Sequence, residues 1–398
     1  MDRRTIKAAL YLGLSLLIAG AGQGCAAPQG GVSATHTVRL YVSNGRDGTI
    51  SQLDAQSGRP LGPPLPGGPT PAWIVAGEGG RLLILPAGAG LQGTLTHVAP
   101  VAGDWQARKV PLELGAQPAL LTGDGHRYAM VGYSVAHPRR RGARPQTESC
   151  RLALIDLHAG AVVRTHRVCA PGDTMTGLAL ASDATGTVAY VALWRPERLA
   201  GGRWQGAAGR LLAVDGFSGE VLESLSVSGL PGAVLLGPAP GRSGRRVYVV
   251  VAAPGASAAP SDDYQRQTIL ADGWQLLGLQ LTTLDLASEQ PIPFLPSHLV
   301  VAPDGEYAYA FVGGGGLSPR STLMELNLLT GASRRLGHVP GPGSGGLAVT
   351  ERRLYVPNPD GREVWVGDRR GRTLATIGVG RHPLGIAMAE HWPLTPGH

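Results

Sequence analysis

Short apolar segments alternate with polar turns rich in glycine and proline along most of the chain. The stretch Arg353–Gly385 shows the unit most clearly: a strand, a turn, a strand, an Asp-containing turn, a strand and a Gly-x-x-Pro sequence. Long amphipathic helical patterns are absent after residue 30, which predicts an all-β protein. One such unit cannot bury its own apolar face, so its repetition predicts a closed ring of small sheets.

The repeat can be counted from its innermost strands, each of which begins near a glycine or proline. Most of them are followed by a tight turn, such as Asp124-Gly125 or Asp304-Gly305, and then by a second strand. The sequence therefore predicts seven blades. Their first strands are Pro71–Gly77, Gln117–Gly123, Thr176–Ser182, Pro231–Gly237, His298–Pro303, Gly345–Val349 and Pro383–Ala389.

A second marker closes the third strand of several units. An Asp or Asn side chain at this point can accept hydrogen bonds from the backbone ahead of it, and a glycine four residues later supplies a positive φ. The marker is missing from the second unit, where the blade boundary is least defined. The four clearest turns are Asp54–Gly58, Asp156–Gly160, Asp215–Gly219 and Asn327–Gly331.

The ends of the chain fall partway through the repeat. The first predicted strand, Val38–Ser43, matches a second strand, whereas the last, Pro383–Ala389, matches a first strand. We therefore predict that three N-terminal strands and one C-terminal strand form a single blade. This closure removes an open sheet edge from the ring.

The second strands of the first and last units resemble the motif of the YVTN β-propeller family. The matching residues are Tyr41-Val42-Ser43-Asn44 and Tyr355-Val356-Pro357-Asn358. The resemblance extends over residues 38–390 and is looser in blades three to five. It implies seven blades. Relatives of this kind include non-catalytic surface proteins as well as lactonase-like and quinone-dependent dehydrogenase propellers, so it implies no single reaction.

The N-terminus is typical of an export signal. Charged residues precede an apolar stretch, Ala8–Ala21, that is too short for a spanning helix. Small residues then lead to Cys25, which resembles the acylated cysteine of bacterial lipoproteins, although Gly22 and Gln23 depart from the usual lipobox. We expect a signal peptide over residues 1–24, a lipid-anchored tether over 25–37, the propeller over 38–390 and a tail over 391–398. Secretion without lipid is the alternative.

Two cysteines remain after the leader, and they flank a predicted hairpin. If Asp156 and Ala161 form a pair beside the turn, Cys150 and Cys169 lie on the same face of the hairpin, one diagonal step apart. A bulge would bring them closer. A disulfide in an oxidising compartment is therefore expected, with two buried free thiols as the alternative.

The charge of the chain changes this picture little. The formal net charge is +7, and nearly all basic residues are arginine, with Lys7 and Lys109 the two lysines. This bias is typical of a GC-rich genome, and a solvated basic surface attracts anionic partners only weakly. We expect no nucleic-acid partner and a monomer, with the membrane reached through the lipid anchor.

Three long insertions separate the second and third strands of consecutive blades. They span Ser134–Ser149 in blade three, Arg195–Gly209 in blade four and Ala253–Trp274 in blade five, and strand alternation places all three on one face. Insertions gathered on one face often mark the binding face. A protein or an anionic small molecule or glycan is the predicted ligand; pairing of basic with acidic loops is the alternative. The candidate binding residues are Arg139, Arg140, Arg141, Arg144, Trp204, Tyr264 and Trp274.

The first strands also begin near the axis, where Trp73, His298 and His382 are further candidates. Two histidines from blades that are not neighbours do not make a metal site, which needs three or four convergent ligands. The chain contains no G-x-S-x-G, H-E-x-x-H or C-x-x-C sequence, which excludes C-x-x-C-H haem attachment. We therefore predict no metal, no cofactor and no catalytic residue.

Two functional hypotheses follow from the sequence. The first is an exported, lipid-anchored and non-catalytic propeller that binds a partner through the long loops of blades three to five. The alternative is an envelope enzyme of the lactonase or quinone-dehydrogenase kind. Catalysis would need titratable groups with shifted pKa values converging on the axis.

Overall fold

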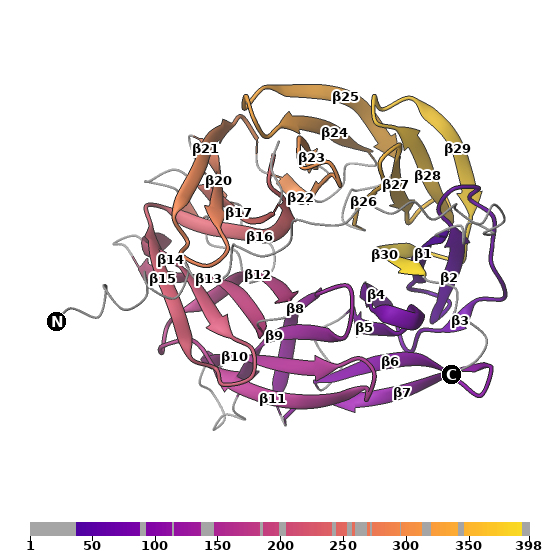
Figure 1. Ribbon diagram of the computed structural model, residues 1–398, viewed down its shortest axis with the longest axis horizontal. Helices are drawn as coiled ribbons and strands as arrows, with labels where there is room; N and C mark the ends of the chain where they lie inside the picture. The colour runs from indigo at the N-terminus through magenta and orange to yellow at the C-terminus, as the bar shows by residue number, and fades with distance from the viewer. Residues whose placement is uncertain are drawn as a thin grey trace, which may run out of the picture. The chain divides into compact units, whose positions relative to one another are not determined.

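The computed structural model describes residues 37–87, 93–113, 115–136, 147–183, 186–198, 204–240, 244–252, 257–258, 269–270, 273–294, 296–312, 320–340 and 346–391. The predicted leader, Cys25 and the C-terminal tail after 391 lie outside these residues. Within the unit His36–His398, seven antiparallel sheets stand around a common centre (Figure 1). The chain is thus an all-β, seven-bladed propeller, as predicted. Among the described residues no helix is long and apolar enough to span a membrane.

Blade one confirms the predicted ring closure. Its strands run in the order β3-β2-β1-β30, so the C-terminal strand takes the innermost place beside three N-terminal strands. In Figure 1 the yellow β30 lies beside the indigo β1. Tyr41 pairs with Ala387 in this register. The strands are β1 (Thr37–Asn44), β2 (Thr49–Asp54), β3 (Leu65–Pro66) and β30 (Pro383–His391).

Each of the other six blades is built from four strands that follow one another outward from the centre in chain order, with β18 and β19 interrupting this order in blade five. Blade two also carries a short 3₁₀ turn, η1 (Glu78–Gly80). Blade two consists of β4 (Pro71–Ala76), β5 (Leu82–Pro86), β6 (Thr94–Val101) and β7 (Asp104–Pro111); blade three of β8 (Ala116–Gly123), β9 (Tyr128–Ala136), β10 (Thr147–Asp156) and β11 (Ala161–Arg167); blade four of β12 (Thr174–Asp183), β13 (Gly186–Arg198), β14 (Trp204–Asp215) and β15 (Val221–Val227).

Blades five to seven follow the same plan. Blade five consists of β16 (Leu230–Pro238), β17 (Arg245–Ala252), β20 (Trp274–Gln280) and β21 (Leu286–Ile292); blade six of β22 (Pro296–Val301), β23 (Tyr307–Val312), β24 (Arg320–Asn327) and β25 (Ser333–Pro340); blade seven of β26 (Ala348–Val349), β27 (Arg353–Asn358), β28 (Glu363–Asp368) and β29 (Thr373–Gly378). Two short strands, β18 (Ser257–Ala258) and β19 (Ile269–Leu270), leave this plan and join the sheet of blade four.

The core lies between neighbouring blades, where the faces of adjacent sheets meet. The tyrosine of the YVTN-like motif recurs on the second strand of five blades, and its ring is almost fully buried in each. Burial of such a ring contributes about 2 kcal/mol or more. The five tyrosines are Tyr41, Tyr190, Tyr248, Tyr309 and Tyr355.

Close packing at the centre requires glycine on the innermost strands. A Cβ at Gly385 would collide with the carbonyl oxygen of Ala72 in the next blade, and a Cβ at Gly177 would collide with the carbonyl of Gly232. Beside Gly385, the Ser43 hydroxyl donates to the Ala72 carbonyl at 3.0 Å. The first strands of neighbouring blades therefore approach backbone to backbone.

The predicted hairpin in blade three is confirmed, including its disulfide. Asp156 pairs with Ala161, and a bulge at Leu154/Ile155 shifts the register by one residue toward Cys150 and Cys169. The two cysteines are bridged, with Cα atoms 5.3 Å apart.

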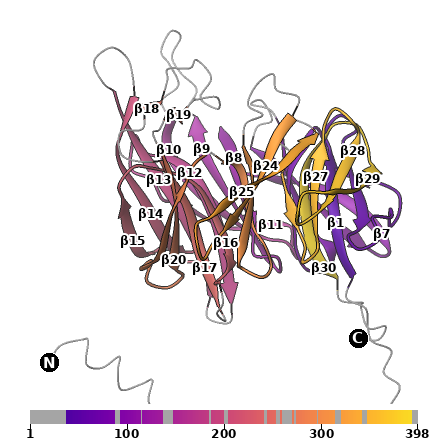
Figure 2. The ribbon, with the colours of Figure 1, turned by 90° about the horizontal axis from the view of Figure 1, so that it is seen from above.

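The alternating strand directions give the ring two faces, which are named here by their connections. The insertion face carries the links from second to third strands and from one blade to the next. The turn face carries the links from first to second and from third to fourth strands. In Figure 2, β18 and β19 project beyond the ring on the insertion face.

Candidate functional site

The insertions of blades four and five are joined into one structure. The β13–β14 hairpin continues well beyond its blade, so the segment predicted as a long loop is largely strand. Its outer end pairs with the insertion of blade five: Trp204 lies opposite Ala258, and Gln205 lies opposite Ser257. The strand β14 thus pairs with β15 in its second half and with β18 at its start. This pairing could not be predicted, because a strand of two residues has no periodicity.

The structure describes only part of the candidate binding residues of this face. Arg139, Arg140, Arg141, Arg144 and Tyr264 lie outside the described residues, and Trp204 is described by its backbone alone. Trp274, by contrast, is a core residue. It is 6% exposed and belongs to a core cluster of apolar side chains from blades four, five and six, among them Trp194, Leu230 and Leu299. Its indole therefore stabilises the core and offers no surface to a ligand.

A buried carboxylate organises the base of the blade-four insertion. The side chain of Asp173 is only 2% exposed, and it is held between Arg195 Nε at 2.8 Å and Arg210 at 2.7 Å. The Ala170 N–H also donates to it at 3.1 Å. Both guanidiniums keep a large exposed surface. Arg195 therefore forms an ion pair with Asp173, which lies in the connection between blades three and four. This contact agrees with the alternative that basic and acidic loops pair with each other, although the sequence did not indicate which residues would pair.

The candidates near the axis differ in exposure. Trp73 in β4 is half exposed. His298 in β22 keeps some accessible area, but protein surrounds its ring, and this desolvation lowers the pKa of His298 to about 4. The imidazole is thus neutral at neutral pH. Among the residues that the structure describes, no three His, Cys, Asp or Glu side chains gather in a metal-binding arrangement.

A small basic cavity lies on the insertion face where blade seven meets blade one. Its volume is about 190 Å³. It is formed by the β1–β2 turn, the β27–β28 turn and the link from β29 to β30, so it spans the junction that closes the ring. His382, a candidate for the axial mouth, lies in this cavity. The lining residues are Arg46, Pro359, Asp360, Arg362, Arg381 and His382.

One of the three arginines of the cavity is already paired. Arg381 binds Asp47 through its Nε at 2.5 Å and also through its backbone N–H. These hydrogen bonds, backbone first, lower the pKa of Asp47, and the charge of Arg362 adds to the effect. Arg46 and Arg362 make no ion pair with a described residue, and both are exposed. Two guanidiniums thus remain open to an anion.

Arg362 has a left-handed backbone conformation, and the equivalent residue of blade one, Gly48, is a glycine. The turns Asn44–Thr49 and Asn358–Glu363 have the same length and connect the same pair of strands. The residue before the third strand has a positive φ in both: 66° at Gly48 and 54° at Arg362. A non-glycine residue there costs roughly 1–2 kcal/mol. The positive φ of His382 is a different case, because Thr70 repeats it before Pro71 in the next blade connection.

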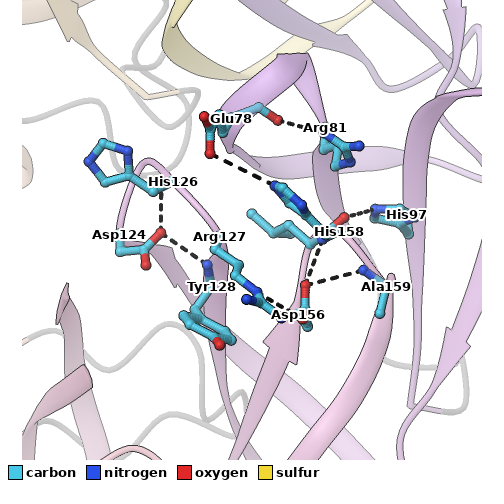
Figure 3. Close-up of polar contacts among 11 residues, drawn as sticks. Glu78, Arg81, His97, Asp124, His126, Arg127, Tyr128, Asp156, His158 and Ala159 are labelled. Carbon is cyan, nitrogen blue, oxygen red and sulfur yellow. Dashed lines mark hydrogen bonds and ion pairs between the residues drawn. The ribbon is translucent and has the colours of Figure 1, made fainter. Parts of the chain in front are cut away.

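The turn face carries a repeated polar latch between neighbouring blades. Each clear Asx turn accepts backbone N–H groups on its Asp or Asn, and the carbonyl of the following residue receives a side chain from the preceding blade. The His97 ring of blade two, labelled in Figure 3, lies 2.7 Å from the Leu157 carbonyl oxygen of blade three. The matching contacts are Tyr355 to Ala55, His166 to Gly216 and Gln290 to Leu328.

Figure 3 also shows how Asp156 is held at this latch. One carboxylate oxygen accepts the His158 and Ala159 N–H groups, while the other accepts two bonds from Arg127, at 3.0 and 2.7 Å. Partial burial alone would raise the pKa of Asp156, but these hydrogen bonds outweigh it and lower the pKa. Nearby, Glu78 and His158 make a long, exposed contact of 3.9 Å. Asp156 and Arg127 therefore stabilise the turn and its contact with the neighbouring strand.

These sheets define the class of protein: a seven-bladed β-propeller closed by its own chain ends. No family model and no curated protein sequence matches the chain. Solved propellers do. A putative 6-phosphogluconolactonase from Bacteroides fragilis NCTC 9343 is similar with a TM-score of 0.55 and 11% identity, over 90% of this chain and 99% of that one.

Two further structures agree at the level of the fold. A putative 6-phosphogluconolactonase from Bacteroides uniformis ATCC 8492 has a TM-score of 0.54 and 14% identity, over 89% of this chain and 99% of that one. Hydrazine synthase of Kuenenia stuttgartiensis has a TM-score of 0.52 and 14% identity, over 83% of this chain and 92% of that one. Proteins whose names indicate such different functions share the architecture, so the likeness shows the fold alone.

Proposed function

We propose that this chain is an exported, lipid-anchored and non-catalytic propeller of the YVTN type, which binds a protein or an anionic ligand through its insertion face. The N-terminal leader and Cys25 support export and anchoring. The disulfide between Cys150 and Cys169 supports an oxidising compartment. The two YVTN-like motifs support the family, since both lie on second strands with their tyrosines buried.

The observation that carries the proposal is the pairing of β14 with β18. Insertions that were merely tolerated would leave each blade separate, whereas here blade five adds strands to the sheet of blade four. An extended edge of this kind, with the half-exposed Arg195 and Arg210 at its base, is a surface on which an anionic partner can bind. A rigid scaffold that presents variable loops is the usual arrangement of a binding face.

The test compares two aromatic positions of blade four. A photo-crosslinking phenylalanine analogue replaces either Trp204 on the insertion face or the exposed Phe217 on the turn face, in protein expressed in its own host. We expect specific adducts from position 204 that decrease when residues 139–144 are deleted, and few from position 217. Equal labelling from both positions, or none from position 204, would contradict a binding role for this face.

The anchor is tested separately, with Cys25→Ser. Acylated protein partitions into detergent, and the variant should move to the aqueous phase because a single cysteine carries the lipid. Retention of the variant in the detergent phase would contradict lipid anchoring at Cys25.

A lactonase-like or quinone-dehydrogenase-like enzyme is the second candidate, and one observation favours it. His298 is a neutral, desolvated imidazole on an innermost strand, where a general base could operate. Lactone hydrolysis and dye reduction by purified protein, compared with His298→Asn, test this candidate. A rate that the substitution abolishes would replace the binding proposal.

A further inference from the structure

We propose that the basic cavity between blades seven and one is a binding site for a small ligand that carries one phosphate or carboxylate group. The site is independent of the blade-four and blade-five edge, because it is built from the β1–β2 turn, the β27–β28 turn and the β29–β30 link.

The charge of the lining favours an oxyanion. Three guanidiniums and one imidazole face a single lining carboxylate, that of Asp360. Asp47 neutralises Arg381 from behind and fixes its position through two hydrogen bonds. Arg46 and Arg362 come from different blades and keep their donors available. Guanidinium donors that converge from two sides are the usual partners of phosphate and carboxylate oxygens.

The size of the cavity limits the ligand. A volume of about 190 Å³ is smaller than the pockets that enclose drug-sized molecules. Asp360 in the lining also repels a second negative group on the same ligand. Both features favour a small molecule with one anionic group over a polyanion that would coat the basic surface.

Arg362 gives a reason to regard the cavity as built for a ligand. Its left-handed conformation is the one that Gly48 adopts without strain in the equivalent turn of blade one. Strained backbone that persists at a single repeat is typical of sites where the side chain has a function. Arg362 lines the same cavity as Arg381, and its charge helps to lower the pKa of Asp47.

The matched variant is Arg362→Gly, which restores the residue of blade one and removes one guanidinium. Arg46→Gln removes the other open cation, and Arg352→Gly is the control. Arg352 is an exposed arginine of the same blade that lies between β26 and β27, on the turn face. Binding of inorganic phosphate and of acetate, which carries a single carboxylate, to the full-length protein is measured by titration calorimetry and by melting temperature, at constant ionic strength set with chloride.

We expect phosphate or acetate to bind the wild-type protein and to raise its melting temperature with concentration. Arg362→Gly and Arg46→Gln should each weaken this binding by about tenfold or more, while Arg352→Gly binds like wild type. The ligand-free melting temperature of Arg362→Gly should not fall, which separates a lost ligand contact from a damaged fold. A preference for phosphate assigns a phosphoryl group to the ligand, and a preference for acetate assigns a carboxylate.

Two results would overturn the site. One is the absence of binding by both anions below about 10 mM. The other is equal binding by wild type, Arg362→Gly and Arg46→Gln, which would indicate general attraction to a basic surface. If the cavity is separate from the face of blades four and five, deletion of residues 139–144 leaves anion binding unchanged while it reduces crosslinking from position 204. Failure of the anion site and failure of the proposed partner binding can therefore be distinguished.

Discussion

The two faces of the ring are stabilised in different ways. On the turn face, one latch repeats from blade to blade: an Asx turn holds its own backbone, and the next carbonyl receives a side chain from the preceding blade. On the insertion face, the polar clusters are single and unrelated, as at Asp173 in blade four and at Arg362 in blade seven. The comparison teaches that repeated hydrogen bonds between blades lie on the turn face, so the sequence of the insertion face can vary without loss of these contacts.

The latches are individually weak and collectively important. A hydrogen bond of this kind contributes about 1 kcal/mol net, and more when one partner is charged. Because each latch joins two blades, loss of one also loosens the packing between them. The insertion face can therefore change its loops without loss of the ring, which is the condition for a binding face on a propeller.

The largest effect is expected on the insertion face, where Asp173 is buried between two arginines. Arg195→Ala or Arg210→Ala alone should reduce the free energy of unfolding by about 1 kcal/mol, because the other guanidinium remains. The double variant should lose about 3–4 kcal/mol, since it leaves a buried carboxylate without a cation. Urea unfolding of all four proteins in a double-mutant cycle measures the coupling. Additive effects would show that Asp173 is solvated and that this face contains no buried ion cluster.

The next effect concerns the turn face and compares two of its turns. Asp156→Ala removes four hydrogen bonds, two of them from Arg127, and should cost about 2–3 kcal/mol. Asp215→Ala at the same position of blade four removes bonds from Phe217 and Ser218 without an arginine, and should cost about 1 kcal/mol. Equal losses in urea unfolding would show that the turn geometry, and not the ion pair, determines the strength of the latch.

A third prediction concerns His298, which belongs to neither face. Its folded-state pKa of about 4 lies below the unfolded value of 6.5, so below pH 6.5 the unfolded chain binds a proton that the folded chain excludes. The free energy of unfolding should therefore fall between pH 6.5 and pH 4, by about 2 kcal/mol after allowance for the partial exposure of the ring. His298→Asn should remove this part of the pH dependence.

Urea unfolding of both proteins at pH 7.5, 6.5, 5.5 and about 4.5 tests this prediction. His97 serves as an internal check, because burial lowers the pKa of His97 as well and its contribution stays in both proteins. Identical pH profiles for wild type and His298→Asn would mean that water reaches the His298 ring freely.

Most of the ring could be predicted because its signals are local. A first strand opens at a proline or glycine, and an Asx turn ends a third strand, so Pro71, Pro383 and Asp156 lie where the repeat placed them. The shared parity of Cys150 and Cys169, together with the export leader, favoured the bridge that the structure shows. Blade two lacked the Asx marker because its third and fourth strands are joined by the short Ala102-Gly103 turn, in which both residues have positive φ.

The functional candidates were harder to predict because they depend on contacts between distant segments. Arg46 and Arg362 are more than three hundred positions apart in the chain and meet only through the ring closure. The charges of Arg195 and Asp173 are visible in the sequence, but their pairing is not. Trp274 was interpreted as a surface aromatic because it borders an insertion. It is in fact the first residue of strand β20, and its side chain is buried in the core.

The smallest expected effect sharpens the comparison between equivalent turns of blades one and seven. Arg362→Gly relieves a left-handed residue, a gain of about 1–2 kcal/mol, but glycine also gains freedom in the unfolded chain, a loss of about 0.5–1 kcal/mol. The net change should lie between zero and about 1.5 kcal/mol of added stability. The reciprocal Gly48→Ala should cost about 1–2 kcal/mol, because φ at this position is 66° and an added Cβ would lie 2.9 Å from the Gly68 carbonyl oxygen. A clear loss of stability in Arg362→Gly would instead mean that the guanidinium stabilises the fold. The arginine in the turn of blade seven would then have a structural role and not a role in ligand binding.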